Sequence, residues 1–180
     1  KIYYESVGRN SLLLLNVPPD KRGLIHQADS CRLMELRAAL DQIFSVNLAA
    51  GAKVKAENTR GGLRRFRASN MLNEDYDSYW TADDNVRTVS FTVTLPEERT
   101  FNLIQLQEYI PLGQRISAFS IDALDENGLW KPIASETTIG YKRIIPVPVT
   151  STKAVRVNIE ESDACPILNG FALYMDSISF

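Results

Sequence analysis

Alternation of apolar and polar residues is the feature that most constrains the fold of this chain. Between Val89 and Leu95, apolar side chains alternate with serine and threonine, which places four apolar groups on one face of a β-strand. Similar runs follow downstream, at residues 117–123, 155–159 and 171–174. Turn residues separate the runs, at 96–98, 111–113, 127–128 and 146, and Asn127-Gly128 predicts a tight hairpin. The pattern predicts a β-sandwich of about 130 residues.

The first fifty residues carry a different pattern. Leu12–Leu15 is a short aliphatic block bounded by turn residues, which is typical of a strand buried on both faces of a parallel sheet. Asp29 is a candidate N-cap, and apolar residues then recur at steps of three and four as far as Phe44, which predicts an amphipathic helix. One strand and one helix cannot enclose a strand of this kind, because it needs neighbours on both sides. We therefore expect residues 1–50 to belong to a larger sheet.

Composition and charge exclude several classes of partner. The chain has 20 Lys and Arg against 22 Asp and Glu and no long basic run, which argues against nucleic acid. The Leu12–Leu15 block is far shorter than the roughly 20 residues that cross a bilayer. Cys31 and Cys165 lack the spacing of a zinc site, so buried free thiols are expected, and a single bridge stays open. Because the chain starts with Lys1, we expect a piece of a longer protein.

Three stretches carry a resemblance to a known family. Residues 4–25, which include the leucine block, resemble the last strand of the catalytic barrel of glycoside hydrolase family 29, the α-L-fucosidases. Residues 106–116 and 137–144 resemble the C-terminal sandwich of the plant-type branch of these enzymes, a member of the discoidin-like, coagulation-factor type C superfamily that includes many galactose-binding modules. The resemblance implies a mainly β chain: a discoidin-like jelly-roll β-sandwich over 51–180, preceded over 1–50 by the last strand and helix of a TIM-like barrel.

The resemblance also implies an activity for the longer enzyme. Retaining hydrolysis needs a nucleophilic carboxylate and an acid/base group about 5 Å apart. In the family both precede the part present in this chain, so no catalytic residue is expected here and the piece alone should be inactive. Asn16, at the end of the barrel-like strand, is expected to support the substrate pocket. The family further implies a periplasmic or secreted location and the rest of the barrel as partner, with no required cofactor.

A structural calcium ion is a second expectation from the resemblance. Discoidin-like modules often hold Ca²⁺ in a loop that ends in Thr-x-Trp, and residues 70–80 resemble that loop, although the family's closing Glu is replaced by Asn169-Gly170. The loss of carboxylates predicts weak binding, because a hard cation prefers six to eight oxygens with negative charge among them. Alternatively, Asx-type hydrogen bonds and Trp80 hold the loop without metal. The candidate ligands are Asn70, Asn73, Asp75, Ser78 and Asn169.

Sugar recognition is a third expectation, since it needs an aromatic face and fixed polar groups. The main candidates flank the family-like segments: Tyr109, Tyr141, Glu108, Arg115 and Arg143. The alternative is structural, with the carboxylate and the two guanidinium groups forming one network that pins the sandwich. Trp130 is expected to cover the core rather than to bind sugar.

Three functions therefore remain open. The chain is the C-terminal, accessory portion of a retaining α-L-fucosidase, a carbohydrate-binding module for fucose- or galactose-containing glycans, or a structural interaction domain. Without the rest of a barrel, Leu12–Leu15 would be bare. The sequence accordingly predicts either a dimer through residues 1–50 or packing of Leu12–Leu15 and the helix onto the sandwich.

Overall fold

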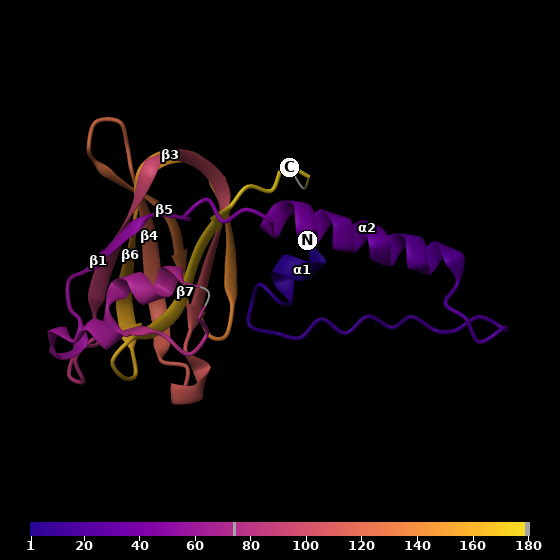
Figure 1. Cartoon of the computed structure of the whole chain (residues 1–180), viewed down its shortest axis with the longest axis horizontal. Coiled ribbons are helices and arrows are strands. Elements are labelled where there is room, and N and C mark those ends of the chain that lie inside the picture. The colour runs from indigo at the N-terminus through magenta and orange to yellow at the C-terminus, as the bar shows by residue number, and fades with distance from the viewer. Residues whose placement is uncertain (74, 179–180) are drawn as a thin grey trace.

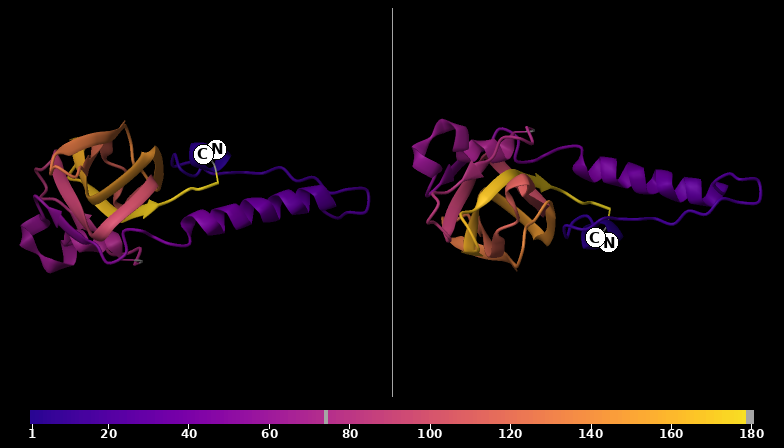
Figure 2. Two further views of the ribbon diagram at one scale, coloured as in Figure 1. Left: turned by 90° about the horizontal axis from the view of Figure 1, so that it is seen from above. Right: turned by 90° about the horizontal axis from the view of Figure 1, so that it is seen from below.

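The computed structural model of the chain describes residues 1–73 and 75–178, and it consists of a β-sandwich and a projecting arm (Figure 1). The arm contains α1 (Ile2–Glu5), an extended segment over 11–18, a turn over 19–26, and α2 (Gln27–Phe44). Views from above and below show α2 and the extended segment running side by side, well beyond the sandwich (Figure 2). Glu74, Ser179 and Phe180 lie outside the described residues.

The sandwich is built from antiparallel strands, which pair in the order β2-β7-β3-β6-β4-β5, with β1 added on β3. They are β1 (Lys53–Ala56), β2 (Trp80–Thr81), β3 (Val89–Glu108), β4 (Ile116–Leu124), β5 (Trp130–Glu136), β6 (Arg143–Ser162) and β7 (Ile167–Tyr174). The predicted mainly β sandwich is confirmed.

The two longest strands pass through both layers of the sandwich. Residues 89–94 of β3 pair with 154–159 of β6 beside β1 and β4, and we call this sheet, which β5 completes, the β1 layer. Beyond a register shift between Thr94 and Arg99, residues 103–106 of β3 pair with 143–146 of β6 and with β7, and we call this sheet, which β2 completes, the β7 layer. The core lies between the two layers.

The alternation in β3 predicts its faces correctly. Phe91 and Val93 are buried, whereas Thr92 and Thr94 point away from the core. Phe91 lies between Trp80 and Phe171, with ring centroids 5.7 and 6.3 Å away. Such aromatic packing at the centre of the core contributes both buried area and specific geometry.

Two of the predicted turns are wrong. Pro96–Glu98 and Pro146 lie inside β3 and β6, which continue through them. Both prolines lie at or beside a register shift, where a strand bends and a missing backbone donor breaks no regular ladder. The turn at 111–113 is confirmed, and so is the β4–β5 hairpin. However, only Gly128 has positive φ there, and the Asp125 carboxylate closes the loop by accepting from two backbone N–H groups.

The predicted helix is confirmed, but its N-cap is not Asp29. α2 begins at Gln27, and His26 caps it: His26 Nδ1 accepts a hydrogen bond from Ala28 N at 3.2 Å. Asp29 therefore lies within the first turn, where its charge still favours the helix dipole. Among the described residues, no helix has the length and hydropathy needed to cross a membrane.

The arm is joined to the outer face of the β7 layer by a small apolar cluster. Ile43 of α2 packs with Leu103 of β3 and Ile144 of β6, and all three are buried. The Phe44 ring meets Tyr174 of β7 edge-on, with centroids 4.9 Å apart. This cluster fixes the direction in which the arm leaves the sandwich.

The leucine block does not pack onto the sandwich, so that part of the prediction is wrong. Leu12 and Leu14 are 85% and 86% exposed. Residues 12–18 are extended but belong to no strand, and their amides donate no backbone hydrogen bond within the part of the chain that the structure describes. Leu13 is half-buried and Leu15 is 40% exposed, so one side of the block is bare, as expected in the absence of further barrel strands.

The central position of Phe91 generates a stability prediction. Phe91→Ala should lower the free energy of unfolding by about 3–5 kcal/mol, because it leaves a cavity beside Trp80. Leu129→Ala, at a side chain that is 63% exposed, is the matched control and should change that free energy by less than about 0.5 kcal/mol. Urea unfolding followed by tryptophan fluorescence measures both, and equal effects would contradict this description of the core.

Candidate functional site

Three tyrosines gather at the end of β3. The Tyr109 ring stacks on Tyr79, with centroids 4.6 Å apart and planes 20° apart, and Tyr76 lies 5.9 Å from Tyr109. Tyr79 and Tyr109 are half-buried and Tyr76 is exposed. Tyr109 was predicted to offer its ring to a sugar, but the ring of Tyr79 already covers one of its faces.

Glu108, next to Tyr109, is a buried carboxylate that is 1% exposed. Its Oε1 accepts from the backbone N–H groups of Arg115 (2.7 Å) and Ile116 (3.0 Å), and its Oε2 accepts from Gly140 N (2.7 Å). Burial raises the pKa of Glu108 above its ordinary value, and these N–H donors oppose the rise. The side chain thus fastens the start of β4 and the loop before β6 to the end of β3.

The predicted network of one carboxylate with two guanidinium groups does not form. Arg115 donates to the carbonyl oxygens of Leu112 and Cys165, and Arg143 pairs with Glu136. The hydrogen bonds that the Glu108 oxygens accept come from backbone N–H groups, and neither guanidinium donates to them. Glu108, Arg115 and Arg143 each have separate partners within the sandwich.

Tyr141 belongs to the junction with the arm. Its backbone N–H donates to Asn10 Oδ1 at 2.7 Å, and its side chain is exposed. Asn10 is the one described non-glycine residue with positive φ, which is compatible with this close approach. Sugar binding by Tyr109, Tyr141 and the three charged residues stays a prediction.

The loop over 70–80 contains the predicted Asx-type hydrogen bonds. Asn73 Oδ1 accepts from Asp75 N (3.2 Å) and Ser78 Oγ (2.8 Å), and Asp75 Oδ1 accepts from Asp77 N (3.1 Å). These contacts shape the loop without a metal ion. Among the described residues, no group of three or more His, Cys, Asp or Glu is placed to hold a metal.

Asn169 nevertheless leaves an oxygen in this loop unpaired. Its Nδ2 donates to Tyr76 O at 3.1 Å, while its buried Oδ1 has no hydrogen-bond partner among the described residues. Asn70, also buried, donates through Nδ2 to Arg65 O and Tyr79 O. An unpaired buried oxygen is costly unless a donor or a cation meets it. The oxygens present fit a hard cation held with little compensating charge.

Asn16 lies in the arm, apart from the other predicted sites. It is exposed and lines a shallow cavity of about 220 Å³ between the extended segment and α2, together with Leu15, Val17, Asp29, Arg32, Leu33 and Leu36. Its support of a substrate pocket stays a prediction. Cys31 is exposed on α2, contrary to expectation, and Cys165 is buried. Both thiols are free, which excludes the single bridge.

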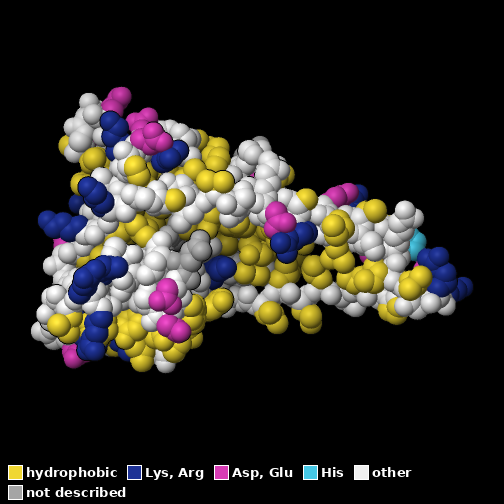
Figure 3. Space-filling model, in the orientation of Figure 1, with side chains coloured by type: hydrophobic (Ala, Val, Ile, Leu, Met, Phe, Trp, Pro, Cys, Tyr) yellow, Lys and Arg dark blue, Asp and Glu magenta, His cyan; other side chains and the backbone are white. Residues whose placement is uncertain are grey.

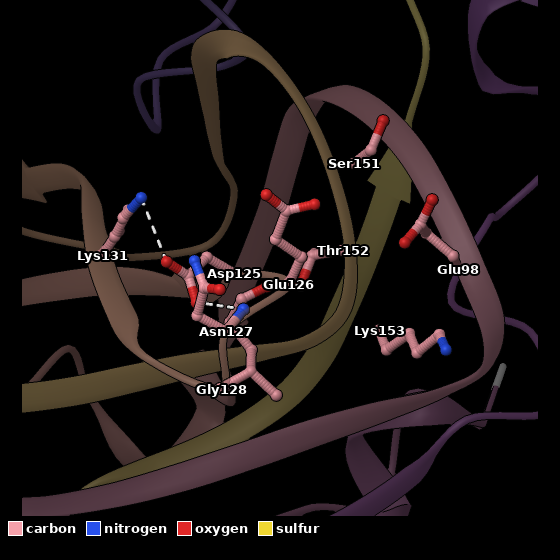
Figure 4. A pocket seen from close by; sticks show the side chains of 10 residues that line it. Glu98, Asp125, Glu126, Asn127, Gly128, Lys131, Ser151, Thr152 and Lys153 are labelled. Carbon is pink, nitrogen blue, oxygen red and sulfur yellow. Dashed lines mark hydrogen bonds and ion pairs between the residues drawn. The ribbon is translucent and has the colours of Figure 1, made fainter.

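A further cavity contains none of the predicted site residues. It has a volume of about 600 Å³ and lies between the β4–β5 hairpin and the bends of β3 and β6 (Figure 4). Glu98, Glu126 and Lys153 line it, and Asp125 pairs with Lys131 at 3.0 Å. No aromatic side chain lines it. The cavity offers no platform for a sugar ring.

A cluster that the sequence patterns did not indicate lies on the outer face of the β1 layer. Arg156 stacks over Trp130, with 4.6 Å from its Cζ to the ring centroid, and bonds Asp122 on the neighbouring strand. Trp130 was expected to cover the core, yet its half-buried ring lines a surface groove instead. Polar residues at positions 90 and 92, and at 156 and 158, indicate that each of the two strands has an outward polar face. Which of these residues lie side by side is known only from the register of β3 with β6.

Comparison with known proteins relates both parts of the chain to fucosidases. The family described as F5/8 type C domain matches residues 53–174. The chain is 42% identical to a putative alpha-L-fucosidase 1 of Oryza sativa subsp. japonica over 180 residues, and 35% identical to alpha-L-fucosidase 1 of Arabidopsis thaliana over 181 residues. Each alignment covers 99% of this chain but only 35% and 36% of the relatives, so the chain spans about a third of their length.

Solved structures give the same relationship. A putative alpha-L-fucosidase from Bacteroides thetaiotaomicron superposes with a TM-score of 0.92 at 37% identity, over 99% of this chain and 39% of that one. A Ruminococcus gnavus GH29 fucosidase in complex with fucose superposes with a TM-score of 0.91 at 29% identity, over 98% and 36%. The resemblance inferred from the sequence is confirmed, and it includes the arm.

The burial of Glu108 generates a pH-dependent prediction. Glu108→Gln places an amide donor against backbone donors and should cost about 1–3 kcal/mol of stability. Because the folded pKa lies above the unfolded one, the stabilisation from this carboxyl is complete below the unfolded pKa and is lost as pH rises through the folded pKa. The stability gap between the parent and the variant should therefore narrow as pH rises above the ordinary pKa of a glutamate, about 4.3.

Urea unfolding at several pH values measures that gap. Glu126→Gln, at an exposed side chain in the β4–β5 hairpin, is the control and should show no gap at any pH. If the difference in stability between the parent and Glu108→Gln stays constant or widens as pH rises, burial does not raise the pKa of Glu108 as described.

Proposed function

Because the chain belongs to the F5/8 type C domain family, we propose that it forms the C-terminal, accessory part of a retaining α-L-fucosidase. In this proposal the arm completes the catalytic barrel and the sandwich braces it. The nucleophile and the acid/base group belong to the preceding part of the enzyme, and Asn16 lies at the edge of the substrate pocket. The family relationship favours a periplasmic or secreted location.

The observation that carries this proposal is the bare leucine block of the arm. Hydrophobic side chains gather along the arm between α2 and the extended segment (Figure 3). Leu12 and Leu14 are almost fully exposed, and the backbone beside them is extended and unpaired among the described residues. An unpaired extended backbone with apolar side chains is a template for neighbouring strands. Barrel strands on both sides of this segment would pair with its backbone and would also help to cover its leucine side chains.

The bracing role follows from the way the arm is attached. The Ile43 cluster joins α2 to β3 and β6, and Asn10 joins the start of the extended segment to the loop before β6. Tyr4 also donates to Asp176 at 2.5 Å, which ties α1 to the segment after β7. Both ends of the arm are thus held by the same layer. The sandwich thereby fixes the last strand and helix of the barrel relative to each other.

In isolation, the same bare surface favours pairing of two copies through residues 1–50, because exposed apolar patches promote association. This dimer is a property of the separated chain in our proposal. It disappears when the rest of the barrel covers the leucines.

Enzyme activity tests the accessory role. The isolated chain should show no turnover of an aryl α-L-fucoside. In the intact enzyme, Leu12→Glu combined with Leu14→Glu should abolish turnover, because two carboxylates would have to be buried in the barrel wall without partners. Leu129→Glu, at an exposed site on the sandwich, should leave turnover unchanged. Turnover by the isolated chain, or an active double variant, would refute the proposal.

A second proposal concerns the loop over 70–80, where the unpaired Asn169 Oδ1 favours a structural Ca²⁺. The Asp75 carboxylate and the side-chain oxygens of Asn73, Ser78 and Asn169 would hold it, together with the Asn70 carbonyl. With a single carboxylate among these donors, affinity should be low.

Thermal unfolding of the chain with increasing CaCl₂ tests the metal site. Binding to the folded state alone raises Tm with ligand concentration, and an excess of chelator reverses the rise. Asp75→Asn should remove the response, whereas Asp163→Asn, in the exposed turn before β7, should retain it. An equal response to MgCl₂, or none to CaCl₂, would show that the loop holds no specific calcium ion.

A further inference from the structure

A cavity of about 340 Å³ lies at the junction of the arm and the sandwich, and we call it the junction cavity. Its lining comes from α1, from the second half of α2 and from the outer face of the β7 layer. Three aromatic residues are part of it: the Phe44 ring lies 5.7 Å from that of Tyr3 and 4.9 Å from that of Tyr174, measured between centroids. Contacts between these rings fix the apolar part of the wall.

Lys142 lines the junction cavity from the sandwich, in the loop before β6. Its carbonyl oxygen accepts a hydrogen bond from Asn10 N at 3.0 Å, so the arm holds its backbone in place. Its side chain is half-buried, and its ammonium group forms no hydrogen bond or ion pair with the residues that the structure describes. Burial lowers the pKa of Lys142 below its ordinary value, because the charged form loses contact with water. A desolvated ammonium group without a partner destabilises the chain.

The other charged groups of the junction cavity do not compensate Lys142. Arg37 and Asp41, both on α2, pair with each other, with 2.6 Å between Nε and Oδ2. Among the described side chains, neither of them is paired with Lys142. The remaining lining residues are uncharged at neutral pH, since they are tyrosine, glutamine or apolar. The cavity therefore carries one uncompensated positive charge.

We propose that the junction cavity receives the carboxylate of an Asp or Glu side chain from the preceding, catalytic part of the enzyme, and that this carboxylate pairs with Lys142. The inference rests on the proposed function, because it identifies a contact through which the sandwich braces the barrel.

The position of the cavity supports this occupant. Phe44 and Tyr174 line the cavity and also belong to the apolar cluster that joins the arm to the sandwich, so the cavity continues an existing interface. The chain corresponds to the C-terminal third of the fucosidases that it resembles. Tyr3 of α1 lines the cavity as well, so the part of the enzyme that leads into α1 would pass beside it.

The charge of the cavity selects a carboxylate. A carboxylate there would face two cations, Lys142 and Arg37, and one anion, Asp41. It would restore the hydrogen bonds that the ammonium group lost on burial, and the aromatic wall would cover its apolar stem. A neutral side chain would leave the ammonium group unpaired. Because a desolvated ion pair is stable only while both members are present, the contact makes the two parts of the enzyme depend on each other.

Amine labelling tests whether Lys142 is covered. The isolated 180-residue chain and the intact enzyme are treated with a low concentration of acetic anhydride, and mass spectrometry quantifies the acetylation of each lysine. Lys142 should react at least about tenfold more slowly in the intact enzyme than in the isolated chain, which corresponds to about 1.4 kcal/mol of protection. Lys53, exposed on β1, should react equally in both.

A variant without the charge distinguishes a carboxylate partner from simple covering. Lys142→Met should lower the Tm of the intact enzyme, because it leaves the partner carboxylate buried without a cation. In the isolated chain it should leave Tm unchanged or raise it, because it removes a desolvated charge. Lys142→Arg should restore most of the Tm that Lys142→Met loses in the enzyme. Lys53→Met is the matched control and should change neither Tm.

Three results would overturn the inference. They are equal labelling of Lys142 in both forms, a Lys142→Met shift of the same sign and size in both, and protection of Lys142 in the isolated chain that grows with chain concentration. The last result would assign the cavity to a second copy of the chain. None of them affects the turnover of an aryl α-L-fucoside by the intact enzyme, so failure of the inference is distinguishable from failure of the proposed function.

Discussion

The pairing of β3 with β6 is the interaction on which the rest of the structure depends. Because these strands run through both layers, their pairing determines which side chains lie on the outer face of the β1 layer and on that of the β7 layer. On the β7 layer, Leu103 and Ile144 carry the arm. On the β1 layer, Thr92 and Arg156 lie opposite each other on the outer face. A one-residue slip of either strand in this register would exchange the inward and outward side chains of the strand that slips. It would remove the arm junction and the groove together.

The sequence correctly predicts which side chains of a strand point into the core. It does not predict where a strand ends or which residues of the neighbouring strand it pairs with. Alternation at 89–95 identifies Phe91 and Val93 as core residues without any knowledge of partners. It cannot show that β3 continues past Pro96, because the bulge that accommodates the proline depends on pairing with β6. Likewise, His26 replaces Asp29 as the helix cap because the preceding Pro19–Ile25 turn decides where α2 begins.

For the predicted site residues, too, the sequence indicates the type of side chain but not its partners. The sequence offers Glu108 as a polar group beside a family-like segment, but its oxygens accept hydrogen bonds from backbone N–H groups of the loops before β4 and β6. The aromatic partners of Tyr109 and the Arg156–Trp130 stack arise between segments distant in sequence. Local pattern marks such residues as polar or aromatic. Only the folded register decides whether they bind the protein itself or remain available to a ligand.

The central claim is that the extended segment of the arm is a strand of a larger barrel. Hydrogen–deuterium exchange of the amides of residues 12–17, compared between the isolated chain and the intact enzyme, tests it most directly. The account predicts rapid exchange in the isolated chain and strong protection in the enzyme, because neighbouring strands would then pair with this backbone. Equally rapid exchange in both would show that the segment never enters a sheet and would contradict the account.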